Sequence, residues 1–137
     1  MKKRSYIFEH AMKVRDYECD AQGYVNNANY QHYFEVARHE FMAKHGLNFY
    51  DLTKKGIDAV VSYVEIRYKS PLFGMEEFTC ALNIKKEGLK YIFNQDIIRL
   101  HDRKLCARGK VEVVCLIDGK LSQPSIFDEA FKEYIQE

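Results

Sequence analysis

Residues 14–38 read VRDYECDAQGYVNNANYQHYFEVAR, and this stretch carries most of the information on the fold. Residues 12–20 alternate between apolar and polar side chains and predict a first strand. A loop rich in Gly and Asn follows, after which the spacing of apolar residues becomes helical. Asn27 is the expected N-cap of a helix that runs to about His45 and ends at Gly46. The stretch therefore predicts a strand, a loop and a long helix.

The predicted helix has one apolar face about 100° wide. Its members follow the i, i+3, i+4, i+7 spacing: Tyr30, Tyr33, Phe34, Ala37 and Phe41. The opposite face carries His32, Glu35 and His39, which we expect to meet solvent or a partner subunit. The predicted helix is unusually rich in aromatic residues, as a helix enclosed by a curved sheet would need to be.

The rest of the chain reads mostly as strand. Four strands are predicted, at residues 57–69, 76–86, 91–100 and 104–117. A short helical turn or loop at 48–55 precedes them, and a short helix is expected from Pro124 to about residue 135. Gly109 indicates a bend or a close backbone approach. Because consecutive strands usually pair, we expect an antiparallel meander and an α+β domain.

Length and composition fit a single domain that covers residues 1–137. The hydrophobic fraction is 47%, enough for one core, and the net charge of +1 gives no general reason to expect nucleic acid as a partner. No leader segment and no apolar run long enough for membrane insertion is visible, so a cytoplasmic location is expected. The four cysteines lack metal-ligand spacing, and we expect no metal.

The chemistry is expected where the first strand, the loop and the helix meet. Asp20 ends the predicted strand, and the first N–H groups of a helix lack intrahelical partners. A carboxylate can activate water or attack a carbonyl, and the N–H groups can stabilise the resulting oxyanion. Acyl hydrolysis uses both. No dinucleotide-binding, P-loop, nucleophile-elbow or zinc-protease motif is present.

Here the sequence resembles the 4-hydroxybenzoyl-CoA thioesterase and YbgC-like family of hotdog-fold thioesterases. That family carries D-x-x-G-H-V-N-N-x-x-Y followed by a helix with E-x-A-R. The residues in register are Asp20, Gly23, Val25, Asn26, Asn27, Tyr30, Glu35, Ala37 and Arg38. The run Tyr68, Lys69, Ser70, Pro71 resembles the family's Y-x-x-P segment, whereas Tyr24 stands where many members have His.

The resemblance implies a hotdog fold, in which a five-stranded antiparallel sheet wraps one long central helix. It implies a thioesterase that hydrolyses acyl-CoA or acyl carrier protein thioesters, with Asp20 as general base or nucleophile. The oxyanion loop would comprise Gly23, Tyr24, Val25, Asn26 and Asn27, with backbone donors around residues 25–29. The substrate would contact Tyr30, Tyr68, Lys69, Ser70 and Pro71. No cofactor is implied beyond coenzyme A as part of the substrate, and a homodimer or homotetramer active in fatty acid metabolism is expected.

Several alternatives stay open. Asp20 could be an ordinary turn residue. Glu35 is the second candidate carboxylate, although the E-x-A-R pattern favours a structural ion pair or hydrogen bond for it. The whole domain could instead be a non-catalytic acyl-CoA-binding module, or a hydratase or dehydratase on the same fold.

Overall fold

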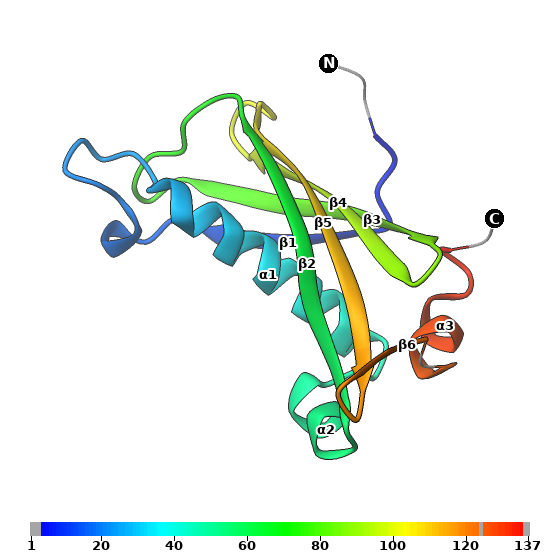
Figure 1. Cartoon of the computed structure of the whole chain (residues 1–137). Helices are drawn as coiled ribbons and strands as arrows, with labels where there is room; N and C mark the ends of the chain where they lie inside the picture. The colour runs from blue at the N-terminus through cyan, green and yellow to red at the C-terminus, as the bar shows by residue number, and fades with distance from the viewer. Residues whose placement is uncertain (1–3, 124, 136–137) are drawn as a thin grey trace.

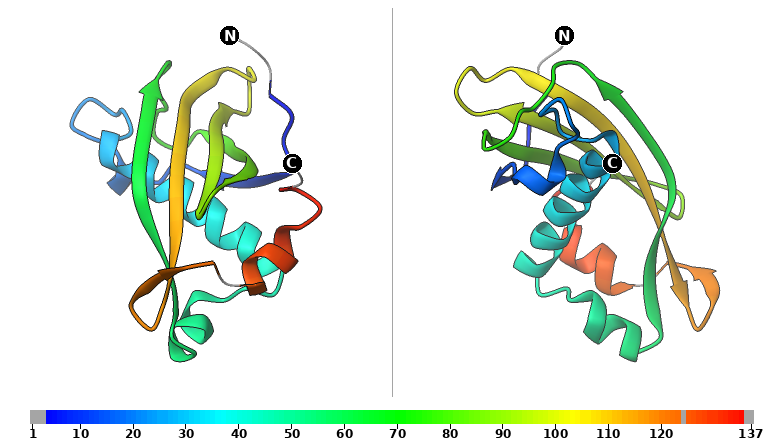
Figure 2. Two further views of the ribbon diagram at one scale, coloured as in Figure 1. Left: turned by 45° about the vertical axis from the view of Figure 1, so that its right-hand side comes forward. Right: turned by 90° about the vertical axis from the view of Figure 1, so that its left-hand side faces the viewer.

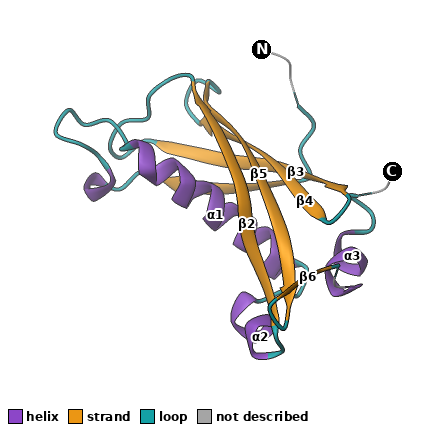
Figure 3. Ribbon diagram, in the orientation of Figure 1, coloured by secondary structure: helices purple, strands orange, loops and turns teal. Residues whose placement is uncertain are grey.

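A curved antiparallel sheet carries one long helix on its concave face in the computed structural model, which describes residues 4–123 and 125–135 (Figures 1 and 2). The elements in chain order are β1 (Phe8–Lys13), the 3-10 turn η1 (Asp16–Glu18), α1 (Asn27–Lys44), α2 (Phe49–Lys54), β2 (Ile57–Tyr68), β3 (Glu77–Glu87), β4 (Lys90–Arg99), β5 (Leu105–Ile117), β6 (Lys120–Ser122) and α3 (Ser125–Phe131). Figure 3 shows how few helical segments accompany the strands. The predicted α+β class is confirmed.

Helix α1 forms where the apolar spacing predicts it. The N-cap is Asn26 and not Asn27, because the Asn26 side chain accepts a hydrogen bond of 3.0 Å from the Ala28 N–H. The helix ends just before Gly46, whose φ of +78° suits glycine. All five residues of the predicted apolar face are buried. Among the described helices, none is both long and apolar enough to cross a bilayer.

The first strand lies earlier than predicted. Residues 12–20 do not form one strand: β1 ends at Lys13, and the chain then turns through η1. Backbone hydrogen bonds from the Glu18 N–H to the Arg15 carbonyl (3.0 Å) and from the Cys19 N–H to the Asp16 carbonyl (3.1 Å) close this turn, and the Glu18 carboxylate caps it by accepting from the Arg15 N–H (2.7 Å). The alternation of apolar and polar residues up to Asp20 therefore wrongly predicted a strand beyond Lys13.

The order of the strands also differs from a simple meander. Strands β3, β4 and β5 pair consecutively, but the full order is β1-β3-β4-β5-β2, so β2 pairs with β5 and not with β3. The connection from β2 to β3 passes the start of α1, where Leu72 is fully buried and its carbonyl accepts a 2.9 Å hydrogen bond from the Val25 N–H. This anchor holds the connection past the start of the helix on its way from the edge strand β2 to β3, which lies between β1 and β4.

Over residues 4–123 and 125–135 the sheet has six strands, where five were expected. The additional strand is the short β6, which pairs with the end of β5. Asp118 and Gly119, both with positive φ, make the tight turn between them. At the C-terminal side, α3 buries Phe127 and Phe131 against the core. Pro124, the predicted opening of this helix, lies outside the described residues.

The close approach predicted at Gly109 is confirmed. A Cβ atom at this position would lie 2.7 Å from the ring of Phe34, which α1 presses onto the middle of β5. Phe34 is fully buried, so its ring has little freedom to move aside. The contact sets the distance between helix and sheet, and thereby the position of the start of α1.

Candidate functional site

A cleft of about 430 Å³ lies at the start of α1, between the 20–26 loop and the connection from β2 to β3. Nine of the residues singled out from the sequence line it: Asp20, Tyr24, Val25, Asn27, Tyr30, Tyr68, Lys69, Ser70 and Pro71. Three others do not line it. Gly23 and the N-cap Asn26 belong to the same loop without lining the cleft, and Glu35 lies on α1 two turns further along. The sequence pattern thus converges on one place.

One oxygen of the Asp20 carboxylate stabilises the loop by accepting hydrogen bonds from its backbone. Oδ1 accepts hydrogen bonds from the N–H groups of Gln22 (2.9 Å) and Tyr24 (3.2 Å). The Asp20 backbone closes the same turn, through Asp20 N–H to the Tyr24 carbonyl (2.8 Å) and Gly23 N–H to the Asp20 carbonyl (3.0 Å). Oδ2 accepts no hydrogen bond from the described residues. A turn role for Asp20 is therefore real, and it leaves half of the carboxylate for chemistry.

The start of α1 leaves one backbone donor without a partner. Four neighbouring N–H groups are occupied: Val25 by the Leu72 carbonyl, Asn26 by the Glu18 carbonyl, Ala28 by the Asn26 side chain, and Asn29 by the Asn26 carbonyl. The Asn27 N–H, at the first helical position, donates to no described residue. Asn27 also lines the cleft. Of the backbone donors expected for the oxyanion at residues 25–29, the Asn27 N–H is therefore the one that is available to a ligand there.

Glu18 holds the loop against the start of α1 through four hydrogen bonds, and its role was not predicted from the sequence. Its Oε1 accepts hydrogen bonds from the Arg15 N–H (2.7 Å) and from the Tyr33 hydroxyl (2.8 Å). Its carbonyl accepts from the Asn26 N–H (3.0 Å) and from the Asn29 side chain (2.7 Å). Burial, followed by the bond to Glu18, raises the pKa of Tyr33. The available signal was Tyr33 itself, because a tyrosine on an apolar helix face needs a hydrogen-bond partner for its hydroxyl.

Two tyrosines form one wall of the cleft. Tyr30 is 3% exposed, and its burial is the main reason that its pKa is raised to about 12. Its ring meets the ring of Tyr68 edge to face at 5.2 Å, and the Tyr68 hydroxyl donates to the Asn27 carbonyl (3.3 Å). Tyr68 is 49% exposed and sits at the end of β2. The wall is thus neutral and largely aromatic.

The loop that follows Tyr68 also lines the cleft, at Lys69, Ser70 and Pro71, and Arg99 fixes its position. Arg99 donates to the Pro71 carbonyl (2.8 Å) and forms a two-pronged ion pair with Asp102 (2.7 and 3.0 Å). The rings of Tyr24 and Phe73 lie 5.0 Å apart and join the two loops at the rim. Tyr24, which replaces the family's His, therefore packs on Phe73. Sequence reasoning missed Arg99 because it is distant along the chain from every motif residue.

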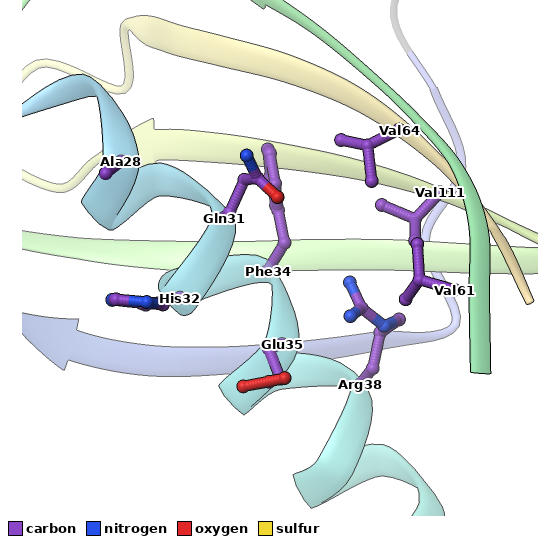
Figure 4. Close-up of a pocket in the computed structure, with 9 residues that line it drawn as sticks. All are labelled: Ala28, Gln31, His32, Phe34, Glu35, Arg38, Val61, Val64 and Val111. Atoms are coloured by element: carbon purple, nitrogen blue, oxygen red, sulfur yellow. The ribbon is translucent and has the colours of Figure 1, made fainter. Parts of the chain in front are cut away.

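Glu35 lies beside a second, smaller space of about 260 Å³ between α1 and β2 (Figure 4). The expected ion pair or hydrogen bond is absent, since Glu35 forms neither with any described residue. Arg38 instead donates to the Gln95 side chain at 3.0 Å. His32, Glu35 and His39 are exposed, as predicted for this face. Within the described part of the chain, no three His, Cys, Asp or Glu side chains are grouped to hold a metal ion.

Comparison with known proteins gives a consistent result. Residues 14–135 match the family model described as the thioesterase-like superfamily. A putative esterase from Aquifex aeolicus is 31% identical over 83% of this chain and 88% of its own length. The chloroplastic acyl-acyl carrier protein thioesterase ATL3 from Arabidopsis thaliana is 32% identical over 80% of this chain, but the match spans only 58% of the plant protein.

Solved structures show the same architecture. A hypothetical protein from Aquifex aeolicus superposes with a TM-score of 0.84 and 28% identity, over 90% of this chain and 98% of that one. A hypothetical protein from Staphylococcus aureus, solved in complex with CoA, gives a TM-score of 0.85 over 98% of this chain and 87% of that one. At 19% identity, the second likeness concerns the fold alone.

Proposed function

The chain belongs to the thioesterase-like superfamily, and we propose that it hydrolyses an acyl thioester of coenzyme A or of acyl carrier protein in the cleft at the start of α1. One observation carries the proposal: the Asp20 carboxylate and the unpartnered Asn27 N–H line the same cleft. A carboxylate that activates water and a backbone donor that stabilises the oxyanion can together carry out thioester hydrolysis.

The proposed reaction needs no group outside the chain other than water. Asp20 takes a proton from water through Oδ2, and the water oxygen bonds to the thioester carbonyl carbon. The carbonyl oxygen becomes negative and receives the Asn27 N–H. The C–S bond then breaks, and the leaving thiolate takes the proton held by Asp20. The products are a free acid and a free thiol.

Direct attack by Asp20 is the alternative first step. It forms an acyl–aspartyl anhydride with loss of the thiolate, and water then hydrolyses the anhydride. A single turnover in heavy-oxygen water separates general-base attack from an anhydride that water opens at the Asp20 carbonyl. General-base attack puts the label in the first acid released, whereas an anhydride opened at the Asp20 carbonyl gives a first acid that carries an unlabelled oxygen from Asp20.

A panel assay tests the proposed function. Free thiol release is measured with short-, medium- and long-chain acyl-CoA, with an aromatic acyl-CoA, and with acyl carrier protein thioesters. Turnover on at least one thioester is expected. Binding without thiol release would favour the acyl-binding module, and water addition to an enoyl thioester would favour the hydratase.

The proposed active form is a homodimer that assembles further into a tetramer. The cleft borders β2, which is an edge strand of the sheet, so the acyl group would be only partly enclosed by one chain. Sedimentation at micromolar protein should give species larger than the 16.2 kDa chain. A single species of the monomer's mass would refute the dimer and leave the proposed chemistry untouched.

A further inference from the structure

Arg38 is a buried cation with a neutral partner. It is 7% exposed, and its Nη1 donates to the Oε1 of Gln95 at 3.0 Å. Gln95 is fully buried and is held in turn by the Phe34 carbonyl (3.0 Å). No carboxylate of the described residues forms an ion pair with Arg38, and its pKa is lowered chiefly by burial. A buried charge without an opposite charge is costly to the fold, so a missing partner is indicated.

The Arg38 side chain borders space that another molecule can reach. It lines the 260 Å³ pocket with Glu35, Val61, Val64 and Val111, and Figure 4 shows it on the side of α1 that faces β2. A neighbouring space of about 240 Å³ shares Glu35, Arg38 and Val61 with the first. Glu35 itself is exposed, although it sits one helical turn from Arg38. The pocket therefore holds a cation and an anion that form no ion pair among the described residues, although the Glu35 charge acts on Arg38 over a longer distance and partly offsets the effect of burial on its pKa.

The open side of this pocket is an edge strand with an unusual number of exposed apolar side chains. β2 pairs with β5 along one side only. Between Val60 and Val64 it exposes four apolar side chains, Val60 (38%), Val61 (47%), Tyr63 (45%) and Val64 (36%), whereas its exposed charges Glu65 and Arg67 lie nearer its end. An apolar stretch of an edge strand is a template for another strand, and natural proteins normally protect such edges with charge or with a partner. A second copy of the chain supplies a strand of identical length and character.

Symmetry then brings the pocket of one copy to the pocket of the other. β2 carries a bulge between Val61 and Tyr63 in its pairing with β5. If it pairs antiparallel with the β2 of a second copy about its middle, the two-fold axis passes close to this bulge. Val61 and Val64, which flank the bulge, both line the Arg38 pocket, so this pairing would bring the two pockets together near the axis.

We propose that the Glu35 carboxylate of each copy pairs with Arg38 of the partner subunit, so that the ion pair occurs twice across the axis. The pair gives the buried guanidinium its missing counter-charge and assigns Glu35 to assembly. The inference rests on the dimer described above and is independent of thioester chemistry. Carboxylate and guanidinium match each other in shape and charge, which gives the interface specificity.

Two charge reversals test it. Glu35→Arg and Arg38→Glu are each expected to raise the dimer dissociation constant at least about tenfold, because each places like charges together. An equal mixture of the two variants should form heterodimers of nearly wild-type affinity, since both contacts are then opposite in sign. An ion pair within one chain cannot be restored by mixing. Sedimentation with one variant fluorescently labelled measures the effect, and Glu40→Arg, on an exposed part of α1 outside the pocket, is the matched control.

A second measurement covers the case in which Arg38→Glu does not fold, as judged by circular dichroism. Glu35→Gln, Arg38→Gln and the double variant form a cycle in which the double variant should associate no more weakly than either single one. Wild-type affinity in Glu35→Arg, or a mixture no tighter than its components, would overturn the proposal. So would an Arg38→Gln variant that dimerises normally but loses turnover on acidic acyl groups, because that result assigns Arg38 to a ligand. Thiol release, assayed in parallel, reports on the proposed function separately.

Discussion

At the scale of single residues, the two oxygens of Asp20 have different surroundings, and Asp20→Asn separates their effects. The amide keeps Oδ1, which holds Gln22 and Tyr24, and replaces the free oxygen with a group that cannot accept a proton. We expect turnover to fall at least about a hundredfold, the lower end for a positioned acid or base. Thermal stability should hold or rise slightly. Thiol release and thermal melting measure the two effects.

Asp16→Asn is the matched control for this experiment, because Asp16 is an exposed carboxylate just before the same loop. It should keep its turnover. The assignment of Asp20 fails if Asp20→Asn retains most of the activity while Glu35→Gln abolishes it in a folded protein.

Lys69 is the cation that lines the cleft, and it is exposed to solvent. We expect it to attract the phosphates of coenzyme A. Lys69→Ala should raise KM up to about fivefold and leave kcat nearly unchanged, since an exposed ion pair contributes at most ~1 kcal/mol. The effect should shrink at high salt, where such pairs are screened. Lys120→Ala, on β6, serves as the control, and a salt-independent KM in the wild type would contradict the assignment.

Single residues also show where sequence reasoning stops. Asp20, Asn27, Tyr30 and Tyr68 lie around one cleft because a local motif encodes most of them together. Glu18 and Arg99 support the cleft through contacts with distant partners, Tyr33 and Pro71. No spacing rule links such pairs in one sequence. The predicted N-cap, Asn27, was one residue away from the observed N-cap, Asn26, because two adjacent asparagines are equally good N-caps.

At the scale of elements, the contact between α1 and β5 depends on the absence of a side chain at Gly109. Gly109→Ala would place a Cβ 2.7 Å from the Phe34 ring. We expect a loss of about 1–3 kcal/mol in the free energy of unfolding, the usual cost of overpacking. Phe34→Leu in the same background should recover part of this loss, because the two sites are coupled. Urea unfolding measures both.

Gly74→Ala is the matched control, because an added Cβ atom has room at this position. Its Cβ would meet the Cys19 sulfur at 3.6 Å, an ordinary contact, and Gly74 does not have a positive φ. Stability should stay the same or rise slightly. Equal losses in the two glycine variants would contradict the role given to the close approach at Gly109.

The elements differ in how far they could be predicted. Helix α1 follows from periodicity because it buries one face, whereas β4, which is buried on both faces, follows from its apolar composition and from the turns at Gly88 and at residues 101–103 that bound it. The position of β2 at the edge of the sheet, next to β5 and not next to β3, could not be predicted. A local pattern specifies a strand but not the strand with which it pairs. β1 was misplaced since residues 14–20 keep the alternation by composition, whereas Glu18 closes a turn there. β6 was too short to give a pattern.

At the scale of the whole molecule, the half-buried Tyr6 and the buried Tyr30 should make the fold less stable at high pH. Burial, with Asp96 as hydrogen-bond partner, raises the pKa of Tyr6 to about 12, and burial raises that of Tyr30 to about 12. In the unfolded chain both ionise near pH 10. Their contribution to stability is therefore complete below pH 10 and is lost as pH rises from 10 toward 12. Urea midpoints should fall across this interval.

Tyr30→Phe should make that fall less steep, whereas Tyr50→Phe, at an exposed position, should leave it unchanged. Midpoints that stay level up to pH 12 would contradict the raised pKa values. Tyrosinate absorbance recorded in parallel identifies which hydroxyls ionise before unfolding.

The pairing of β2 with β5 has a consequence for synthesis on the ribosome. Paired residues in these two strands are 39 to 60 positions apart in the chain, from Tyr68 and Ala107 to Ile57 and Ile117. At usual translation rates, β2 emerges about 2–12 s before its partner. During that interval the valines of β2 have neither β5 nor the strand of a second copy to cover them. The nascent chain is therefore most vulnerable to aggregation through the same strand that later completes the sheet.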